Sequence, residues 1–141
     1  IIDQHGNIVG RHDGAIYYTI GQRRGLDVGG GLPFYVVGKD MKKNEVYVTT
    51  ELNDKRLWNQ ELGLTDLHWI NQVPKAGKEL QVRSRHRAAL VDGTLGVALK
   101  RPKTNQTTLS VALSDDIRAV TPGQSAVLSD GDTVLGGGII V

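Results

Sequence analysis

Short runs of β-branched and aromatic residues, separated by polar turns, limit what this chain can fold into. Residues 34–38 and 45–50 are two such runs around a polar segment, residues 40–44, which is the pattern of a β-hairpin. Asp92-Gly93 and Asp130-Gly131 also lie between apolar runs, where glycine can adopt positive φ in a tight turn. The sequence therefore predicts three hairpins.

Alternation of apolar and polar residues indicates strands that are buried on one face. Leu80 and Val82 alternate with polar neighbours, and so do Leu109, Val111 and Leu113. Short strands at regular spacing are typical of β-barrels. Apolar residues at three- and four-residue spacing never continue beyond about three helical turns, and the best helical candidate is residues 14–22.

A polar stretch at residues 51–56 follows the first hairpin and predicts a domain boundary. The chain has 141 residues and is 39% hydrophobic, enough for one or two modest cores. We expect a small β domain over residues 1–53 and a barrel over residues 54–141. The chain begins at Ile1 without Met and ends on apolar residues, which predicts a fragment of a longer protein; a chain trimmed of a few disordered residues is the alternative.

Composition excludes several classes of protein. The absence of cysteine excludes a disulfide framework, a zinc ribbon and thiol chemistry carried by this chain. Its apolar runs fall short of the roughly 20 residues of a membrane helix, and its N-terminus does not resemble a secretory leader. We expect a soluble, cytoplasmic protein with no membrane partner.

Charge is unevenly distributed although the net charge is only +2. Seven Lys or Arg residues lie between Lys78 and Lys103, whereas acidic residues predominate after residue 114. Arg83, Arg85 and Arg87 follow one another at two-residue spacing, so on a strand they share one face at intervals of roughly 6–7 Å. This spacing resembles that of phosphates along a nucleic acid, whose neutralisation makes binding salt-dependent. A solvated outer face of a strand is the equally open alternative.

Residues able to carry chemistry are few. The four histidines, His5, His12, His68 and His86, have no partner at a recognisable metal-ligand spacing. His12-Asp13 has no matching nucleophile, so we interpret it as structural. His86 has the inward-facing parity of Leu80 and Val82 but falls near the end of its strand, where it could either cap the barrel or turn out to a ligand.

Gln124 follows Pro122-Gly123 and therefore lies at a turn, where its amide could reach a phosphate or a ribose. A hydrogen bond that closes the turn is the alternative.

Two blocks of the sequence carry a resemblance to a known family. They are Gly10-Arg11-His12-Asp13-Gly14 with Tyr18-Thr19-Ile20-Gly21-Gln22-Arg23-Arg24-Gly25-Leu26, and Thr121-Pro122-Gly123-Gln124-Ser125-Ala126-Val127 with Leu135-Gly136-Gly137-Gly138-Ile139-Ile140. In order and separation they resemble the C-terminal half of the bacterial tRNA-specific 2-thiouridylases, the MnmA/TrmU family, across essentially the whole chain.

The resemblance implies a mainly β fold, with a small β roll followed by a six-stranded antiparallel barrel like those of translation factors. It implies a parent enzyme, a tRNA-uridine 2-sulfurtransferase, that uses ATP, with Mg expected, to thiolate C2 of the wobble uridine. The ATP loop and the catalytic cysteines of that family belong to an N-terminal domain upstream of Ile1, so the resemblance implies an inert, tRNA-positioning part. Its implied partners are tRNA, the missing catalytic domain and a sulfur-donor protein.

The family's tRNA contacts fall by motif on Arg85, His86 and Gln124. His86 stands where the family usually has Tyr, which keeps a planar ring but changes its polarity. Arg83 and Arg87 are implied secondary contacts, and so are Arg23 and Arg24 of the small domain, although Gln22, Arg23 and Arg24 could instead pack against the missing domain.

Two other functions remain open. An autonomous RNA-binding barrel of a translation-related protein would bind RNA tightly by itself. A purely structural domain would buttress a catalytic neighbour through Tyr17, Tyr18 and residues 21–26, with the basic strand merely solvated.

Overall fold

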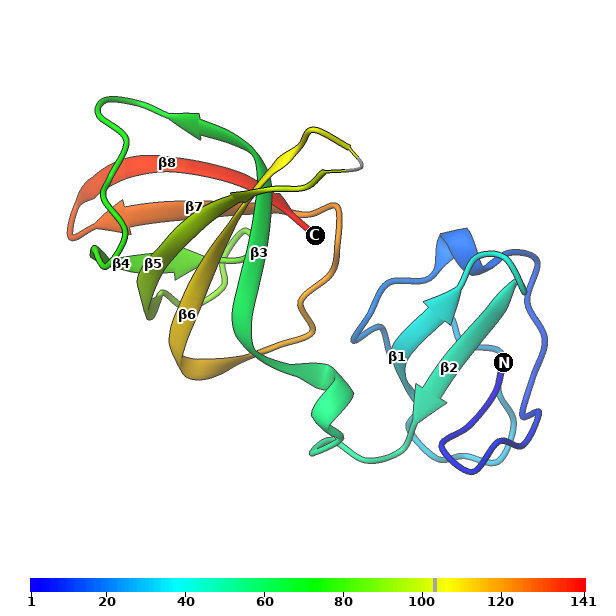
Figure 1. Cartoon of the computed structure of the whole chain (residues 1–141). Helices are drawn as coiled ribbons and strands as arrows, with labels where there is room; N and C mark the ends of the chain where they lie inside the picture. The colour runs from blue at the N-terminus through cyan, green and yellow to red at the C-terminus, as the bar shows by residue number, and fades with distance from the viewer. Residues whose placement is uncertain (103) are drawn as a thin grey trace. The chain divides into compact units, whose positions relative to one another are not determined.

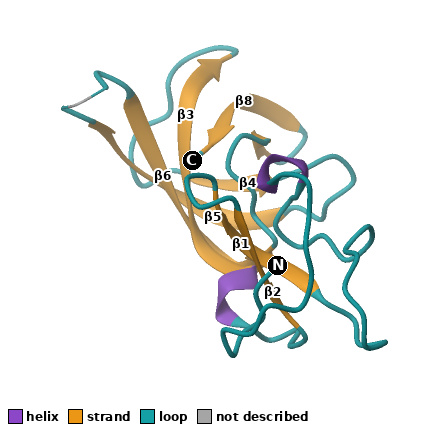
Figure 2. Cartoon of the chain, turned by 90° about the vertical axis from the view of Figure 1, so that its right-hand side faces the viewer, coloured by secondary structure: helices purple, strands orange, loops and turns teal. Residues whose placement is uncertain are grey.

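The chain forms two compact units, which are described separately. In the computed structural model, residues 1–102 and 104–141 are described, and Lys103 of the basic stretch lies outside them. Residues 1–58 with residues 118–120 form a small unit, and residues 59–117 with residues 121–141 form a barrel unit. Strands and loops dominate both units, with only short helical turns (Figures 1 and 2). The predicted mainly β fold is confirmed.

The small unit is built on the hairpin that the sequence predicts. Strands β1 (Tyr35–Asp40) and β2 (Glu45–Thr49) pair antiparallel. Both faces of this two-stranded sheet are covered because successive side chains of β1 enter different clusters. Val36 packs with Ile1, Ala15, Val46 and Val48, whereas Tyr35 and Val37 pack with Leu57.

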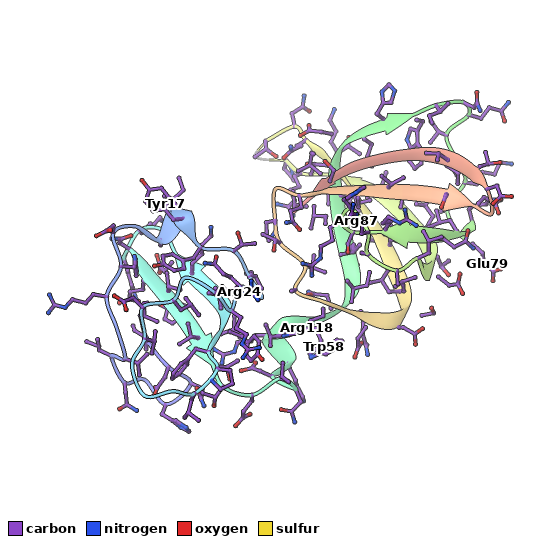
Figure 3. All side chains as sticks on the ribbon, turned by 180° about the vertical axis from the view of Figure 1, so that it is seen from behind. Tyr17, Arg24, Trp58, Glu79, Arg87 and Arg118 are labelled. Carbon is purple, nitrogen blue, oxygen red and sulfur yellow. The ribbon has the colours of Figure 1, made fainter. Side chains whose placement is uncertain are left out.

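The helix expected at residues 14–22 is reduced to one turn. Only η1 (Ala15–Tyr17) is helical, as a single 3₁₀ turn. The N–H of Ala15, at the start of this turn, donates a 2.8 Å hydrogen bond to the amide oxygen of Asn44. Tyr17 is exposed and projects from η1 into solvent (Figure 3).

The polar stretch before the barrel contains a second 3₁₀ turn, η2 (Lys55–Leu57). The carboxylate of Asp54 caps this turn by accepting a hydrogen bond from the N–H of Arg56, and it also forms a 2.7 Å ion pair with the Arg56 guanidinium. The side-chain hydrogen bond from Arg56 lowers the pKa of Asp54 from 3.8 to about 2.

The barrel unit is a closed, six-stranded antiparallel barrel, as predicted (Figure 1). Its strands are β3 (Trp58–Trp69), β4 (Glu79–Arg83), β5 (Val91–Lys100), β6 (Thr107–Arg118), β7 (Ser125–Asp130) and β8 (Thr133–Ile140). The strand order is β3-β6-β5-β4-β7-β8, and β8 pairs back with β3 to close the barrel. The predicted inward residues Leu80, Val82, Leu109 and Val111 are buried in its interior.

One of the two Asp-Gly turns is confirmed and the other is wrong. Asp130-Gly131 joins β7 to β8, with Gly131 at φ 59. Asp92-Gly93 instead lies inside β5, opposite Gln81 and Leu80 of β4. A Cβ at Gly93 would meet the carbonyl oxygen of Ala112 at 3.0 Å, so the glycine serves close approach between strands and not a turn.

Glycines also allow β8 to pack tightly between its neighbours. A Cβ at Gly136 would lie 2.1 Å from the carbonyl oxygen of His68 on β3, and one at Gly137 would lie 2.5 Å from that of Ala126 on β7. These positions therefore fix the approach of the strands that close the barrel. Among the described residues, no helix is long and apolar enough to cross a membrane.

Candidate nucleic-acid interface

The basic segment does not continue as a strand through all three predicted arginines. Strand β4 ends at Arg83, and a turn follows in which the N–H of Ala88 donates to the carbonyl of Arg85 at 3.1 Å. Arg87 has φ 62, a left-handed conformation that a regular strand cannot contain. The prediction that Arg83, Arg85 and Arg87 share one strand face is therefore wrong.

His86 turns outward, which is one of the two orientations that the sequence leaves open. Ser84 takes the inward position after Val82 and is buried, whereas His86 is exposed in the turn. Alternation stops predicting orientation where the strand ends, because a turn reorients each side chain individually. His86 is thus available to solvent, with Arg85 beside it.

Three of the predicted site residues meet in one hollow of the barrel unit. Its volume is about 440 Å³, and it is lined from β4, the following turn, β7 and the start of β8 by Arg83, Arg85, His86, Leu90, Ser125, Val127, Ser129, Gly131, Asp132 and Val134. Sheet register explains this grouping, because Arg83 pairs directly with Val127. The antiparallel direction carries the residues after Arg83 toward Ser125 at the start of β7.

Gln124 lies on a hydrogen-bonded turn next to this hollow. Pro122 and Gly123, the latter at φ 90, form the two central positions of a turn closed by a 3.2 Å hydrogen bond from the N–H of Gln124 to the carbonyl of Thr121. The carbonyl of Gln124 accepts from the N–H of Ile140 at 2.8 Å. Gln124 does not itself line the hollow, but its neighbour Ser125 does. Its backbone is fixed at the end of the hollow where the Arg85 turn lies.

The opposite end of the hollow carries negative charge. The β7–β8 turn brings Gly131 and Asp132 to the wall, and the N–H of Gly131 donates to the amide oxygen of Gln81 at 2.9 Å. Asp130 is engaged separately in an ion pair with Lys78. The acidic and basic stretches of the sequence therefore meet at one hollow, which sequence reasoning missed.

The other predicted contacts lie outside this hollow. Arg87 is exposed in the turn after β4, and Arg24 is exposed on the small unit (Figure 3). Arg23 lines a different hollow of about 270 Å³ in the small unit, with Leu26 and Phe34 among its neighbours. The amide of Gln22 is engaged within its own loop, where it accepts from the N–H of Thr19 at 3.0 Å and donates to the carbonyl of Arg24 at 2.9 Å.

The side chains gathered in the hollow suit the binding of an anion. The described part of the chain contains no group of three His, Cys, Asp or Glu side chains close enough to hold a metal ion. His12 makes an edge contact with the ring of Tyr18, with centroids 5.3 Å apart, in line with a structural role. An exposed hollow with clustered guanidinium groups can bind a polyanion, because arginine forms paired hydrogen bonds to phosphate oxygens.

Comparison with known proteins decides the family. A family model described as the aminomethyltransferase beta-barrel domain matches residues 59–140, and one described as the tRNA methyl transferase PRC-barrel domain matches residues 1–50. The tRNA-specific 2-thiouridylase MnmA of Bacillus subtilis (strain 168) is 38% identical over 136 residues, which are 96% of this chain and 36% of that protein. The chain belongs to the MnmA family. The resemblance of its two sequence blocks is thereby confirmed.

Other MnmA relatives match to a similar extent. The protein of that name from Listeria monocytogenes serovar 1/2a is 40% identical over 136 residues, and that from Shewanella amazonensis is 38% identical over 141 residues. In both cases the match covers 96% of this chain, but only 35% and 36% of the relative. The chain thus spans about a third of the length of the MnmA relatives that it matches.

Proposed function

We propose that this chain is the tRNA-gripping part of a tRNA 2-thiouridylase and that the hollow of the barrel unit is its RNA contact. The observation that carries the proposal is the meeting of Arg83, Arg85 and His86 in one exposed hollow. The names of the MnmA relatives identify tRNA as the RNA on which those proteins act.

Each residue has a distinct proposed role. Arg85 pairs with a phosphate through its forked donors, and His86 stacks on or hydrogen-bonds to the adjacent nucleotide. Gln124 fixes the register of the RNA by an amide hydrogen bond from its hydrogen-bonded turn. Arg83 adds attraction from the wall of the hollow, and Arg87, Arg23 and Arg24 are secondary contacts.

The chemistry belongs to the rest of the parent protein. We propose that ATP with Mg, the catalytic cysteines and the docking of a sulfur-donor protein reside in the two thirds of the MnmA relatives that this chain does not match. The chain then has no catalytic residue of its own. It holds tRNA so that the wobble uridine reaches the distant active site.

A salt series tests the RNA contact. We would measure the affinity of the 141-residue chain for an unmodified tRNA with a wobble uridine, using wild type, Arg85→Ala and Lys75→Ala. Each phosphate neutralised contributes about one to the slope of log affinity against log salt, so Arg85→Ala should lower the slope by about one. Lys75 is an exposed cation outside the hollow and serves as the matched control.

Four outcomes separate the candidate functions. Weak, salt-sensitive binding that loses slope only in Arg85→Ala supports the tRNA grip. Equal slopes for all three proteins would remove Arg85 from the interface. Absence of RNA binding would favour the structural buttress, and tight binding to unrelated RNA would favour an autonomous RNA-binding barrel.

A further inference from the structure

The floor of the hollow is apolar, which phosphate binding alone does not require. Leu90, Val127 and Val134 line it and are 48%, 42% and 46% exposed. A single exposed apolar side chain is ordinary in a folded protein, whereas three that line one hollow form a patch of the kind that marks a binding surface. A phosphate gains nothing from them, because its oxygens interact with charges and N–H donors.

The hollow also has a direction along β7. Arg83 lies opposite Val127 in the sheet register, and the turn with Arg85 continues toward Ser125. Asp132 comes from the turn at the other end of β7, where it joins β8. Arg85 and Asp132 therefore lie toward opposite ends of the hollow, with Val127 and Arg83 between them.

We propose that this hollow holds one unpaired nucleotide of the bound RNA. The base lies flat on the floor of Leu90, Val127 and Val134, and the phosphate lies at the arginine end. A base has apolar faces and polar edges, and proteins that recognise RNA sequence bind unpaired bases because those edges are then accessible. This inference rests on the proposed function and extends it, since a grip on backbone phosphates alone would leave the floor unused.

The carboxylate of Asp132 determines which bases fit. An ionised carboxylate only accepts hydrogen bonds, and it repels phosphate, which orients the nucleotide with its base toward Asp132. Adenine, cytosine and guanine carry an exocyclic amino group that can donate to it. Uracil can donate only through N3–H, which lies between two carbonyl oxygens that the carboxylate repels. The site therefore favours a nucleotide whose base carries an amino group over uridine, so we infer that the captured nucleotide is distinct from the uridine named in the relatives' activity.

An RNA strand suits the surface better than a free nucleotide. A second hollow of about 340 Å³ adjoins the first and shares Ser125, Val127 and Val134 with it. It continues across β8 to His68 and Ile70 at the end of β3. The nucleotides on either side of the captured one thus have a surface along which to run.

The floor is tested by replacing methyl groups with hydroxyl groups. Val127→Thr with Val134→Thr keeps the β-branched shape, and Val97→Thr, at a 63% exposed position of β5 outside the hollow, is the matched control. Loss of about one buried methyl at each site should weaken binding of the unmodified tRNA roughly tenfold for the pair. The salt slope should stay unchanged, because no charge is removed.

Base preference is tested with short oligo(A) and oligo(U) strands. Wild type should bind oligo(A) more tightly than oligo(U), and Asp132→Asn should reduce the ratio of the two affinities several-fold. Asp116→Asn, an identical charge change at an exposed position of β6, should leave the ratio unchanged. Comparing ratios cancels the general electrostatic gain from removing a negative charge.

The results distinguish this inference from the proposed function. The double variant Val127→Thr with Val134→Thr could bind the tRNA as tightly as Val97→Thr, with the same salt slope. That result would overturn the nucleotide site but would leave the proposed phosphate contact intact. Equal affinities of wild type for oligo(A) and oligo(U) would overturn the role of Asp132. No binding of any RNA would overturn both the site and the function.

Discussion

Replacement of Gly136 by alanine should push apart β3 and β8, the two strands whose pairing closes the barrel. The new Cβ would lie 2.1 Å from the carbonyl oxygen of His68 and 3.0 Å from the Cα of Trp69. Both are backbone atoms of β3, so no side-chain rotation relieves the contact. To bring the closer contact to 3.0 Å, β3 and β8 must separate by about 0.9 Å.

Separating β3 from β8 by this distance weakens the backbone hydrogen bonds between the two strands. The N–H of Ile70 donates to the carbonyl of Leu135 at 3.0 Å, and a shift of this size takes such a bond beyond the roughly 3.2 Å limit. We expect the loss of two or three hydrogen bonds between β3 and β8, at about 1 kcal/mol each, and about 1–3 kcal/mol of strain. Alanine also restricts the unfolded chain, which stabilises the protein by only about 0.4–1 kcal/mol. We expect a net destabilisation of roughly 3 kcal/mol.

Urea and thermal unfolding of the 141-residue chain measure this effect. A loss of 3 kcal/mol should lower Tm of the barrel transition by roughly 12–20 °C. Gly63→Ala on β3 is the matched control, since its nearest contact is a side-chain atom of Val141 at 3.2 Å, which can move. If the free energies of unfolding of Gly136→Ala and Gly63→Ala differ by less than about 1 kcal/mol, Gly136 does not set the spacing between β3 and β8.

Two further predictions concern the small unit. The Arg56 hydrogen bond holds the pKa of Asp54 at about 2, below its ordinary 3.8, so the stability that it contributes is complete above pH 3.8 and is lost as pH falls through about 2. Asp54→Asn should therefore cost about 1 kcal/mol near neutral pH, a value reduced by the partial exposure of the ion pair, and only a small part of this near pH 2. Urea unfolding of both proteins between pH 7 and pH 2 measures this, and a constant difference in stability would contradict the prediction. Gln22→Ala removes the hydrogen bonds to Thr19 and Arg24 and should lower the free energy of unfolding by about 1 kcal/mol, whereas an unchanged unfolding curve would show that water replaces both.

Periodicity predicted the barrel well because burial on one face is a local property of each strand. Leu80 and Val82 show it clearly, and they enter the core as expected. The same rule failed at Arg87, since alternation in the sequence continues past the point where the backbone adopts φ 62. An isolated sequence does not mark that point, because arginine is compatible with both strand and turn.

Short sequence motifs do not reveal where two strands pack closely against each other. Asp92-Gly93 has the composition of a hairpin turn, yet its glycine lies opposite Leu80 and Leu113 within the barrel wall. Only the paired strands reveal that a Cβ would meet backbone there. An Asp-Gly dipeptide therefore indicates a position that requires glycine. It does not show whether a tight turn or the close approach of a neighbouring strand imposes that requirement.

The candidate site was predicted in part. Arg85 and His86 were identified by motif, but Leu90, Val127 and Asp132 were missed because they come from segments far apart in the sequence. One signal was present: Val127 has the opposite parity to the inward-facing Ala126 and Leu128, so it had to face outward. An apolar residue on the outward face of a barrel strand is a cue that the sequence alone provides.

Amide hydrogen exchange of the 141-residue chain, with and without an unmodified tRNA carrying a wobble uridine, tests the location of the RNA most directly. We expect slower exchange in residues 84–90 and 124–134, which form the hollow and its adjoining turn, and unchanged exchange in residues 96–100 of β5. Protection confined to other segments while tRNA is bound would contradict the assignment of the hollow as the RNA contact.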